Sequence, residues 1–272
     1  MQDLVVAVVV GILQGIIEWL PVSSQGNLAV VLTALGSNPD TALQLALFLQ
    51  LGTTLSAASY YRDELQQTAA IAPDWRPGRA FEGQNRLLSF LGVASLCTGL
   101  VGIPVYVLAV DAASELAGGV FIAMIGLLLV LTGVAQLASE SLSLGSRETP
   151  TLLDSVLVGA FQGLTILPGV SRSGTTTSVL LFRNYEPPAA FRLSFLLSIP
   201  ASLGGAALTL AGAGGLPGIG PGPALVALTT SAVVGYLAID VLLAVVERVP
   251  FWAVCFGLGG LAIVGGGAIW LL

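Results

Sequence analysis

Six long runs of apolar residues constrain the fold of this chain more than any other feature. They cover residues 41–61, 87–110, 117–138, 191–213, 224–246 and 251–272. A helix needs about 20 apolar residues to cross a hydrocarbon core of roughly 30 Å, so each run is long enough for one crossing. Only 9% of the residues are charged, too few to cover a water-soluble surface. The sequence therefore predicts an all-α integral membrane protein with six transmembrane helices in a single domain, residues 1–272.

Two further apolar stretches are too interrupted to cross a membrane. Residues 4–35 are broken at 21–26, and residues 152–182 are broken at 168–174. Each stretch predicts two half-length helices of about 9–15 residues that enter and leave the membrane on one side, as a re-entrant pair. Under this topology one face of the protein carries eight arginines and the opposite face carries none; the eight are Arg62, Arg76, Arg79, Arg86, Arg147, Arg183, Arg192 and Arg248. The positive-inside rule then places that face in the cytoplasm and both termini outside the plasma membrane.

The two interrupted stretches resemble each other at an offset of 148 residues. The matched pairs are Gly11 and Gly159, Gln14 and Gln162, Gly15 and Gly163, Ser23 and Ser171, and Gly26 and Gly174. We expect a duplicated unit of one re-entrant pair and one span, residues 4–61 and 152–213. Three spans lie between the two re-entrant pairs, so the copies have opposite topologies. Such inverted repeats form a site near the midplane, where their broken helices meet.

The second break, PGVSRSGTT at residues 168–176, places a charged residue beside an apolar segment. Arg172 lies between Ser171 and Ser173, directly before Gly174 and an expected helix start at Thr175. Backbone N–H groups at a helix N-terminus and a guanidinium together favour an anion such as phosphate. Alternatively, the serines cap the helix while the arginine pairs with a carboxylate. The break therefore predicts either a phosphate clamp or a capped helix with an ion pair.

The first break supplies a carboxylate and several hydroxyl groups. Glu18 lies one helical turn after Gln14, and Ser23, Ser24 and Asn27 follow it. Glu18 either binds a cation, acts as a base for a neighbouring hydroxyl, or neutralises the arginine of the second break. Together the two breaks suit phosphoryl transfer from an amphiphilic substrate that enters from the lipid.

The remaining polar residues of the apolar runs carry weaker signals. Gln44, Gln50 and Gln162 are expected to form hydrogen bonds between helices. Asp240 either lines the same cavity as the breaks or pairs across the helix bundle. The chain has a net charge of −6 and no lysine, which gives no indication of a nucleic-acid partner.

A longer pattern emerges when the two breaks are read together. The sequence QGIIEWLPVSSQGN at residues 14–27, followed by PGVSRSGTT at 168–176, resembles the undecaprenyl-diphosphatase family, also called the bacitracin-resistance protein family. The resemblance covers the full chain. It implies a membrane hydrolase that converts a polyprenyl diphosphate to the monophosphate and so recycles the lipid carrier of cell-surface glycan synthesis. It also implies a divalent cation, Mg²⁺ or Ca²⁺, a homodimer, and an active site open to the extracytoplasmic side.

The family resemblance assigns roles to individual positions. It implies catalytic roles for Glu18, Ser24 and Arg172, and metal ligation by Glu18 and Gln14. The residues expected to contact substrate phosphate are Ser23, Asn27, Ser171, Ser173, Gly174 and Thr176. Two positions depart from the pattern, because the family usually has an acid at Gln14 and a histidine at Asn27, and this chain has no histidine. Either Ser24 therefore attacks, with Glu18 as base or metal ligand, or a metal-bound water attacks directly.

Two other functions fit the same pattern. Inverted repeats with broken helices are typical of transporters, so the chain could move a polyprenyl phosphate or another anion across the membrane. It could also be a silent homologue that binds lipid phosphate without hydrolysing it. Phosphate release from a lipid diphosphate separates the enzyme from both alternatives.

Overall fold

The computed structural model describes residues 2–142, 145–246 and 248–271, and the described residues are helical with no strand. Eleven α-helices follow in chain order: α1 (Gln2–Ile17), α2 (Ser24–Ala34), α3 (Pro39–Tyr60), α4 (Arg62–Ile71), α5 (Asn85–Glu115), α6 (Gly118–Leu142), α7 (Leu152–Leu164), α8 (Arg172–Phe182), α9 (Pro187–Gly212), α10 (Pro221–Val246) and α11 (Phe251–Leu271). Two short 3₁₀ turns, Ala72–Asp74 and Pro77–Arg79, lie between α4 and α5. The all-α prediction is confirmed.

Six of these helices, α3, α5, α6, α9, α10 and α11, are long and apolar enough to cross a membrane. They coincide with the six apolar runs of the sequence. Their outward faces expose large apolar side chains, including Leu100 at 68% and Leu237 at 73% exposure, which a soluble protein would bury. The chain is therefore a multi-pass membrane protein.

The interrupted stretches form the half-length helices α1, α2, α7 and α8. Each second helix starts after a serine N-cap whose hydroxyl accepts a backbone N–H three residues on: Ser23 from Gly26 and Ser171 from Gly174, both at 3.2 Å. The helices therefore break at residues 18–23 and 165–171. The observed breaks begin and end three residues earlier in the chain than the predicted ones at 21–26 and 168–174. The helix start predicted at Thr175 lies three residues earlier as well, at Arg172. The reason is that each serine cap lets the helix begin at the next residue.

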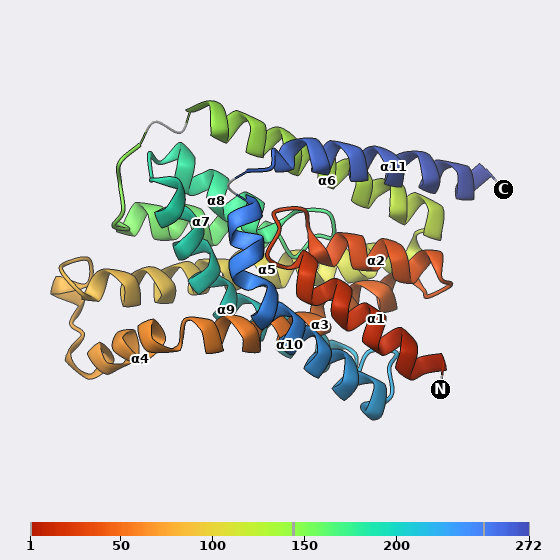
Figure 1. Cartoon of the computed structure of the whole chain (residues 1–272), viewed down its shortest axis with the longest axis horizontal. Coiled ribbons are helices and arrows are strands. Elements are labelled where there is room, and N and C mark those ends of the chain that lie inside the picture. Colours follow the sequence, from red (N-terminus) through yellow and green to blue (C-terminus); the bar gives the residue numbers. More distant parts are fainter. Residues whose placement is uncertain (1, 143–144, 247, 272) are drawn as a thin grey trace.

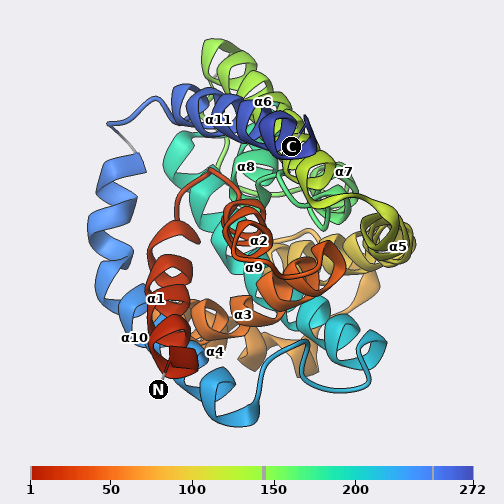
Figure 2. The same ribbon diagram turned by 90° about the vertical axis from the view of Figure 1, so that its right-hand side faces the viewer.

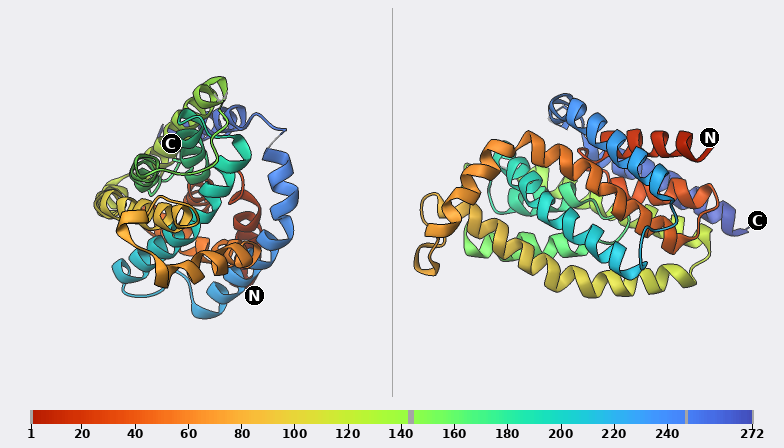
Figure 3. Two further views of the ribbon diagram at one scale, coloured as in Figure 1. Left: turned by 90° about the vertical axis from the view of Figure 1, so that its left-hand side faces the viewer. Right: turned by 90° about the horizontal axis from the view of Figure 1, so that it is seen from below.

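The long helices run between two ends of the molecule (Figure 1). The start of α1 and the end of α11 lie at one end, and α4 lies at the other (Figures 1 and 3). The re-entrant topology and the duplication stay predictions from the sequence.

Glycines allow the half-length helices to approach their neighbours closely. Gly11 and Gly15 of α1 face α10, where an added Cβ would lie 2.6 Å from the carbonyl oxygen of Ala227 and 2.9 Å from the nitrogen of Gly235, respectively. The matched Gly159 of α7 faces α5, and a Cβ there would lie 2.3 Å from the carbonyl oxygen of Ala94. Small residues are the usual contact of membrane helices, because they let backbones meet. Figure 2 shows α1 alongside α10.

A buried carboxylate holds the α4 end of the bundle together. Asp154 is fully buried and accepts hydrogen bonds from Arg147 at 2.8 Å, Arg183 at 2.7 Å and Tyr185 at 2.8 Å. It also accepts the backbone N–H and hydroxyl of Thr151, so it completes a capping box at the start of α7. Burial alone would raise the pKa of Asp154, but these donors outweigh it and hold that pKa below its ordinary value of 3.8. The cluster fixes α7 to the loop before α9.

We expect Asp154→Asn to destabilise the protein by about 3 kcal/mol near neutral pH, because it leaves two guanidinium groups without their shared carboxylate. Thermal unfolding followed by tryptophan fluorescence in detergent should show a Tm loss of roughly 5–10 °C. Because the folded pKa is depressed, the contribution is complete above pH 3.8 and is lost as the pH falls through the folded value. The difference in Tm between wild type and Asp154→Asn should therefore narrow as the pH falls through the folded pKa, below 3.8. A Tm difference between Asp154→Asn and wild type that does not change with pH would contradict this role. An equal loss of Tm in Asp74→Asn, at an exposed position, would contradict it as well.

Candidate active site

The two helix breaks lie directly against each other in the middle of the bundle. Ser23 accepts the backbone N–H of Gly169 at 3.2 Å, and Gln25 Nε2 donates to the carbonyl of Ile166 at 2.8 Å. Gly169 has a φ of 98°, and a Cβ on Gly26 would lie 2.5 Å from its nitrogen. A larger residue at either position would separate the two breaks. The contact brings the first break's carboxylate to the second break's arginine.

Glu18 is the centre of this junction and is 6% exposed. Its Oε2 accepts hydrogen bonds from Ser24 Oγ at 2.5 Å and from Gln14 Nε2 at 2.9 Å. Its Oε1 pairs with Arg172 Nη2. The carboxylate therefore contacts a hydroxyl, an amide and a guanidinium at once, and it is placed to accept the proton of Ser24.

Arg172 keeps binding capacity beyond this ion pair. It is the first residue of α8, and its Nε and Nη1 are buried without a hydrogen-bond partner among the described residues. An arginine that served only to neutralise Glu18 would not need these two nitrogens inside the protein. The guanidinium can therefore donate to phosphate oxygens while it holds Glu18. The capping and ion-pair reading of the second break is confirmed, because Ser171 caps α8 and Arg172 pairs with Glu18. The phosphate clamp stays a prediction.

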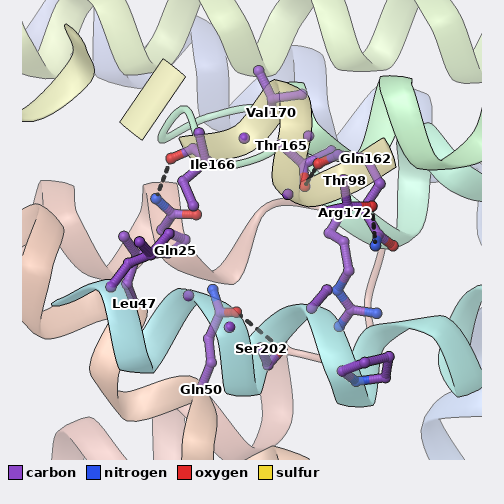
Figure 4. A pocket seen from close by; sticks show the side chains of 18 of the residues that line it. Gln25, Leu47, Gln50, Thr98, Gln162, Thr165, Ile166, Val170, Arg172 and Ser202 are labelled. Carbon is purple, nitrogen blue, oxygen red and sulfur yellow. Dashed lines mark hydrogen bonds between the residues drawn. The ribbon is translucent and has the colours of Figure 1, made fainter. Parts of the chain in front are cut away.

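Arg172 borders a cavity of about 390 Å³. Helices α3, α5, α7 and α9 supply most of its wall, and the two breaks supply one end. Figure 4 shows Arg172, Gln162 and Thr98 grouped on one side of this cavity, with Gln25 and Leu47 on the other. The wall also carries apolar and small residues, such as Ile103, Gly204, Leu208 and Ala211. A cavity with both polar and apolar lining suits an amphiphile.

Six of the predicted site residues line this cavity: Glu18, Ser23, Ser24, Ser171, Arg172 and Ser173. The remaining four do not line it. Gln14 and Asn27 border a second cavity between α1, α2, α6 and α11, which Ser24 also reaches. Asn27 donates to the carbonyls of Val22 and Ser23 at 2.7 and 3.0 Å, so its amide supports the break.

Thr176 and Gly174 lie behind the cavity wall. Thr176 is fully buried, donates to the carbonyl of Arg172 at 2.8 Å, and shares a hydrogen bond with Ser194 at 2.6 Å. Gly174 donates its N–H to Ser171, and a Cβ there would lie 2.6 Å from Gln136 Nε2. Both residues hold α8 in place beneath the arginine. Their predicted contact with phosphate stays a prediction.

The structure adds polar residues that the sequence did not single out as part of the site. Ser95, Thr98 and Gln162 line the cavity from α5 and α7, and Gln162 Nε2 donates to Thr98 Oγ1 at 3.0 Å. Ser202 donates to Gln50 at 3.3 Å on the opposite wall. The expected interhelical hydrogen bonds of Gln50 and Gln162 are confirmed. Asp240 pairs across the bundle, accepting from Tyr60 at 2.7 Å, and does not line the cavity.

The fold and the site define a class: a multi-pass membrane protein with a serine, a carboxylate and an arginine at the polar end of an amphipathic cavity. Residues 7–261 match the family described as "Bacitracin resistance protein BacA", and the chain belongs to this family. A relative from Haloarcula marismortui is 49% identical over 98% of both chains. Relatives from Methanococcoides burtonii and Methanopyrus kandleri are 36% and 37% identical over at least 96% of each chain. All three are named undecaprenyl-diphosphatase.

Proposed function

We propose that this protein hydrolyses the diphosphate of an undecaprenyl-type polyprenyl diphosphate and releases inorganic phosphate and the lipid monophosphate. The observation that carries this proposal is the contact of Ser24, Glu18 and Arg172 in a cavity whose wall also carries apolar and small residues. Family membership and the names of the relatives support the same reaction. They favour it over the transporter that the broken helices also suggested.

The geometry supports Ser24 as the nucleophile. Its hydroxyl already donates to Glu18 Oε2 at 2.5 Å, so Glu18 takes the proton as Ser24 Oγ attacks the terminal phosphorus. The new bond joins Ser24 Oγ to phosphorus, and the bond between phosphorus and the bridging oxygen breaks. The lipid monophosphate leaves with that oxygen and takes the proton from Glu18, which is then a base again. Water attacks the phosphorus of the phosphoserine as Glu18 accepts its proton, the bond from phosphorus to Ser24 Oγ breaks, and Glu18 returns the proton to Ser24 as inorganic phosphate leaves.

Arg172 stabilises the charge on the transferring phosphoryl group. Arg172 lines the cavity, and its Nε and Nη1 have no hydrogen-bond partner among the described residues, so they are free to donate to the equatorial phosphate oxygens. Its Nη2 fixes Glu18 so that Oε2 stays directed at Ser24. One side chain therefore positions the base and neutralises the phosphate.

A divalent cation fits beside this set. Gln14 Oε1 is a buried acceptor with no hydrogen-bond partner among the described residues, and Gln14 contacts Glu18. We propose that Glu18 and Gln14 hold Mg²⁺ or Ca²⁺ together with substrate oxygens, since both ions take oxygen ligands and Mg²⁺ is often held by one or two carboxylates plus phosphate. When bound, the cation neutralises phosphate charge. The described residues contain no cluster of three or more acidic, histidine or cysteine side chains, so protein ligands alone would bind it weakly.

We expect Gln14→Glu to lower the cation concentration for half-maximal activity about tenfold, because a second carboxylate raises the charge of the ligand set. The measurement is phosphate release as Mg²⁺ and Ca²⁺ are titrated separately. Gln25→Glu is the matched control, since Gln25 bonds the carbonyl of Ile166 rather than Glu18. An unchanged cation requirement in Gln14→Glu would remove Gln14 from the proposed cation site.

The contacts of charged residues near the helix ends support the proposed orientation in the membrane. Arg192 of α9 pairs with Glu64 of α4, and Arg86 of α5 donates to Thr149 at 2.9 Å, which gathers segments far apart in sequence at the α4 end. We propose that this end faces the cytoplasm and that substrate enters from the extracytoplasmic side. The homodimer implied by the family resemblance stays a prediction.

The proposal is tested with purified protein in detergent and farnesyl diphosphate as a short substrate, in the presence of Mg²⁺ or Ca²⁺. We expect inorganic phosphate and farnesyl monophosphate in equal amounts. Binding of farnesyl diphosphate without hydrolysis would instead support the silent homologue. Movement of a polyprenyl phosphate across liposomes without hydrolysis would support the transporter.

A further inference from the structure

Helices α5 and α9 both line the main cavity, and their seam is filled by large side chains at two levels. At the α4 end, Phe90 of α5 shares a buried hydrophobic cluster with Leu193 and Leu197 of α9. Toward the opposite end, the buried Tyr106 of α5 reaches α9, where a Cβ on Gly212 would lie 3.3 Å from the tyrosine hydroxyl oxygen. The residues of the seam that border the cavity lie mostly between these two levels.

Glycines take the place of large side chains in this middle part of the seam. Gly99 and Gly102 of α5, and Gly204 and Gly205 of α9, all line the cavity. A Cβ on Gly99 or Gly204 would meet no heavy atom within 4 Å, and one on Gly205 would meet only the side chain of Leu47, at 3.9 Å. The glycines of α1 and α7 let helices touch, but these three do not serve helix contact. Their missing side chains leave the seam open.

The main cavity reaches the outer surface of the protein at this seam. Four residues are exposed and also line the cavity: Ile103, Gly204, Ala207 and Ala211. Large apolar side chains are exposed beside them, such as Leu100 of α5 at 68% and Leu203 of α9 at 51%. Both helices are long and apolar enough to cross a membrane. The opening therefore faces the hydrocarbon of the membrane rather than water.

The opening lies at the level of the second helix break. A Cβ on Gly102 would lie 3.4 Å from the carbonyl oxygen of Gly163, which is two residues before that break begins. From this level a strip of small residues, Gly204, Ala207 and Ala211, follows one face of α9 toward its end, at spacings of three and four residues. Small residues on an exposed helix face leave a shallow groove between larger neighbours. The groove starts beside the reacting centre and runs along the lipid-facing surface.

The chain of an undecaprenyl lipid is far larger than a cavity of about 390 Å³, so it must leave the cavity while its diphosphate is bound at Arg172. We propose that the chain leaves sideways, through the opening between α5 and α9, and lies along the groove of α9. Gly99 and Gly204 are then specificity-determining residues, because they leave room for a methyl-branched isoprenoid chain. The inference rests on the proposed function, and it names the path of the lipid chain.

The test compares two non-hydrolysable ligands that differ only in chain length, dimethylallyl and farnesyl methylenediphosphonate. The single isoprene unit of the first stays inside the cavity, whereas the longer chain of the second reaches the opening. Wild-type protein should therefore bind the farnesyl ligand more tightly, because it buries more apolar surface. We expect Gly99→Leu and Gly204→Leu to weaken the farnesyl ligand at least about tenfold and to leave the Kd of the dimethylallyl ligand within about threefold. Isothermal titration calorimetry in detergent measures both ligands without turnover.

Gly92→Leu is the matched control. Gly92 is exposed on the same helix as Gly99, and a Cβ there would also meet no heavy atom within 4 Å, but Gly92 does not line the cavity. It should leave the Kd of both ligands within about threefold. Leucine favours a helix more than glycine does, so each variant should fold, and thermal unfolding verifies this.

Unchanged farnesyl affinity in one variant would remove that glycine from the path, and unchanged affinity in both Gly99→Leu and Gly204→Leu would overturn the opening. Equal losses for the two ligands, an equal loss in Gly92→Leu, or wild-type protein that binds both ligands equally would overturn it as well. The proposed function fails separately. If the variants block only the longer chain but wild-type protein never hydrolyses farnesyl diphosphate, the opening stands and the enzyme does not.

Discussion

Replacement of Ser24 by alanine is expected to lower kcat by about 10⁴-fold or more, the largest effect of any single substitution in the site. The mutant lacks the oxygen that forms the covalent bond to phosphorus, while Glu18 keeps its contacts with Gln14 and Arg172. The measurement is phosphate release from farnesyl diphosphate at saturating substrate. KM should change little, because Ser24 contributes mainly to the chemical step.

A covalent intermediate gives this prediction its second measurement. Wild-type protein quenched with acid during turnover should carry a phosphoryl group on Ser24, detectable by mass spectrometry of the peptide. Ser202→Ala is the matched control, because Ser202 lines the same cavity but donates to Gln50. We expect it to retain activity within about tenfold. If Ser24→Ala also stays within this range and no phosphopeptide forms, a water molecule rather than Ser24 attacks the phosphorus.

The second large effect is expected at Arg172. Arg172→Ala should reduce kcat/KM by about 10³- to 10⁵-fold, as found where an arginine stabilises a transferring phosphoryl group. It removes two donors that have no partner among the described residues and also the partner of Glu18, which is buried in the break. Arg172→Lys keeps the charge but not the planar fork, so it should recover only part of the activity.

A matched substitution separates this effect from a general loss of arginine. Arg192 pairs with Glu64 at the α4 end, away from the cavity, and Arg192→Ala should leave kcat/KM within about threefold. The Tm of each variant distinguishes lost catalysis from lost folding. Full rescue by Arg172→Lys would mean that a positive charge is sufficient and that two simultaneous contacts from the guanidinium are not required.

Much of this architecture could be predicted from the sequence, because lipid imposes simple rules. Long apolar runs must form helices that satisfy their own backbone, so the six spans were predictable from length and composition. The breaks were predictable because proline, glycine and serine interrupt apolar segments at two matched positions. Glu18 and Arg172 were recognisable because charged residues in such segments are costly and are retained for function.

The sequence could not reveal which polar residues share a cavity. Asn27 lies three residues from Ser24, but its amide turns to the carbonyls of Val22 and Ser23 and borders the second cavity. Gln162 is distant in sequence from Ser95, and only the packing of α7 on α5 brings them to one wall. Side-chain direction and helix contacts, rather than spacing, decide such sets.

The most direct test of the central claim is hydrolysis of a polyprenyl diphosphate by purified protein in ¹⁸O-labelled water. Attack at the terminal phosphorus, as the Ser24, Glu18 and Arg172 geometry requires, predicts equal amounts of inorganic phosphate and lipid monophosphate. The label should appear only in the inorganic phosphate, and both products should be lost in Arg172→Ala. Label in the lipid monophosphate, or no phosphate release from wild-type protein with Mg²⁺ or Ca²⁺ across a range of salt concentrations, would contradict the account.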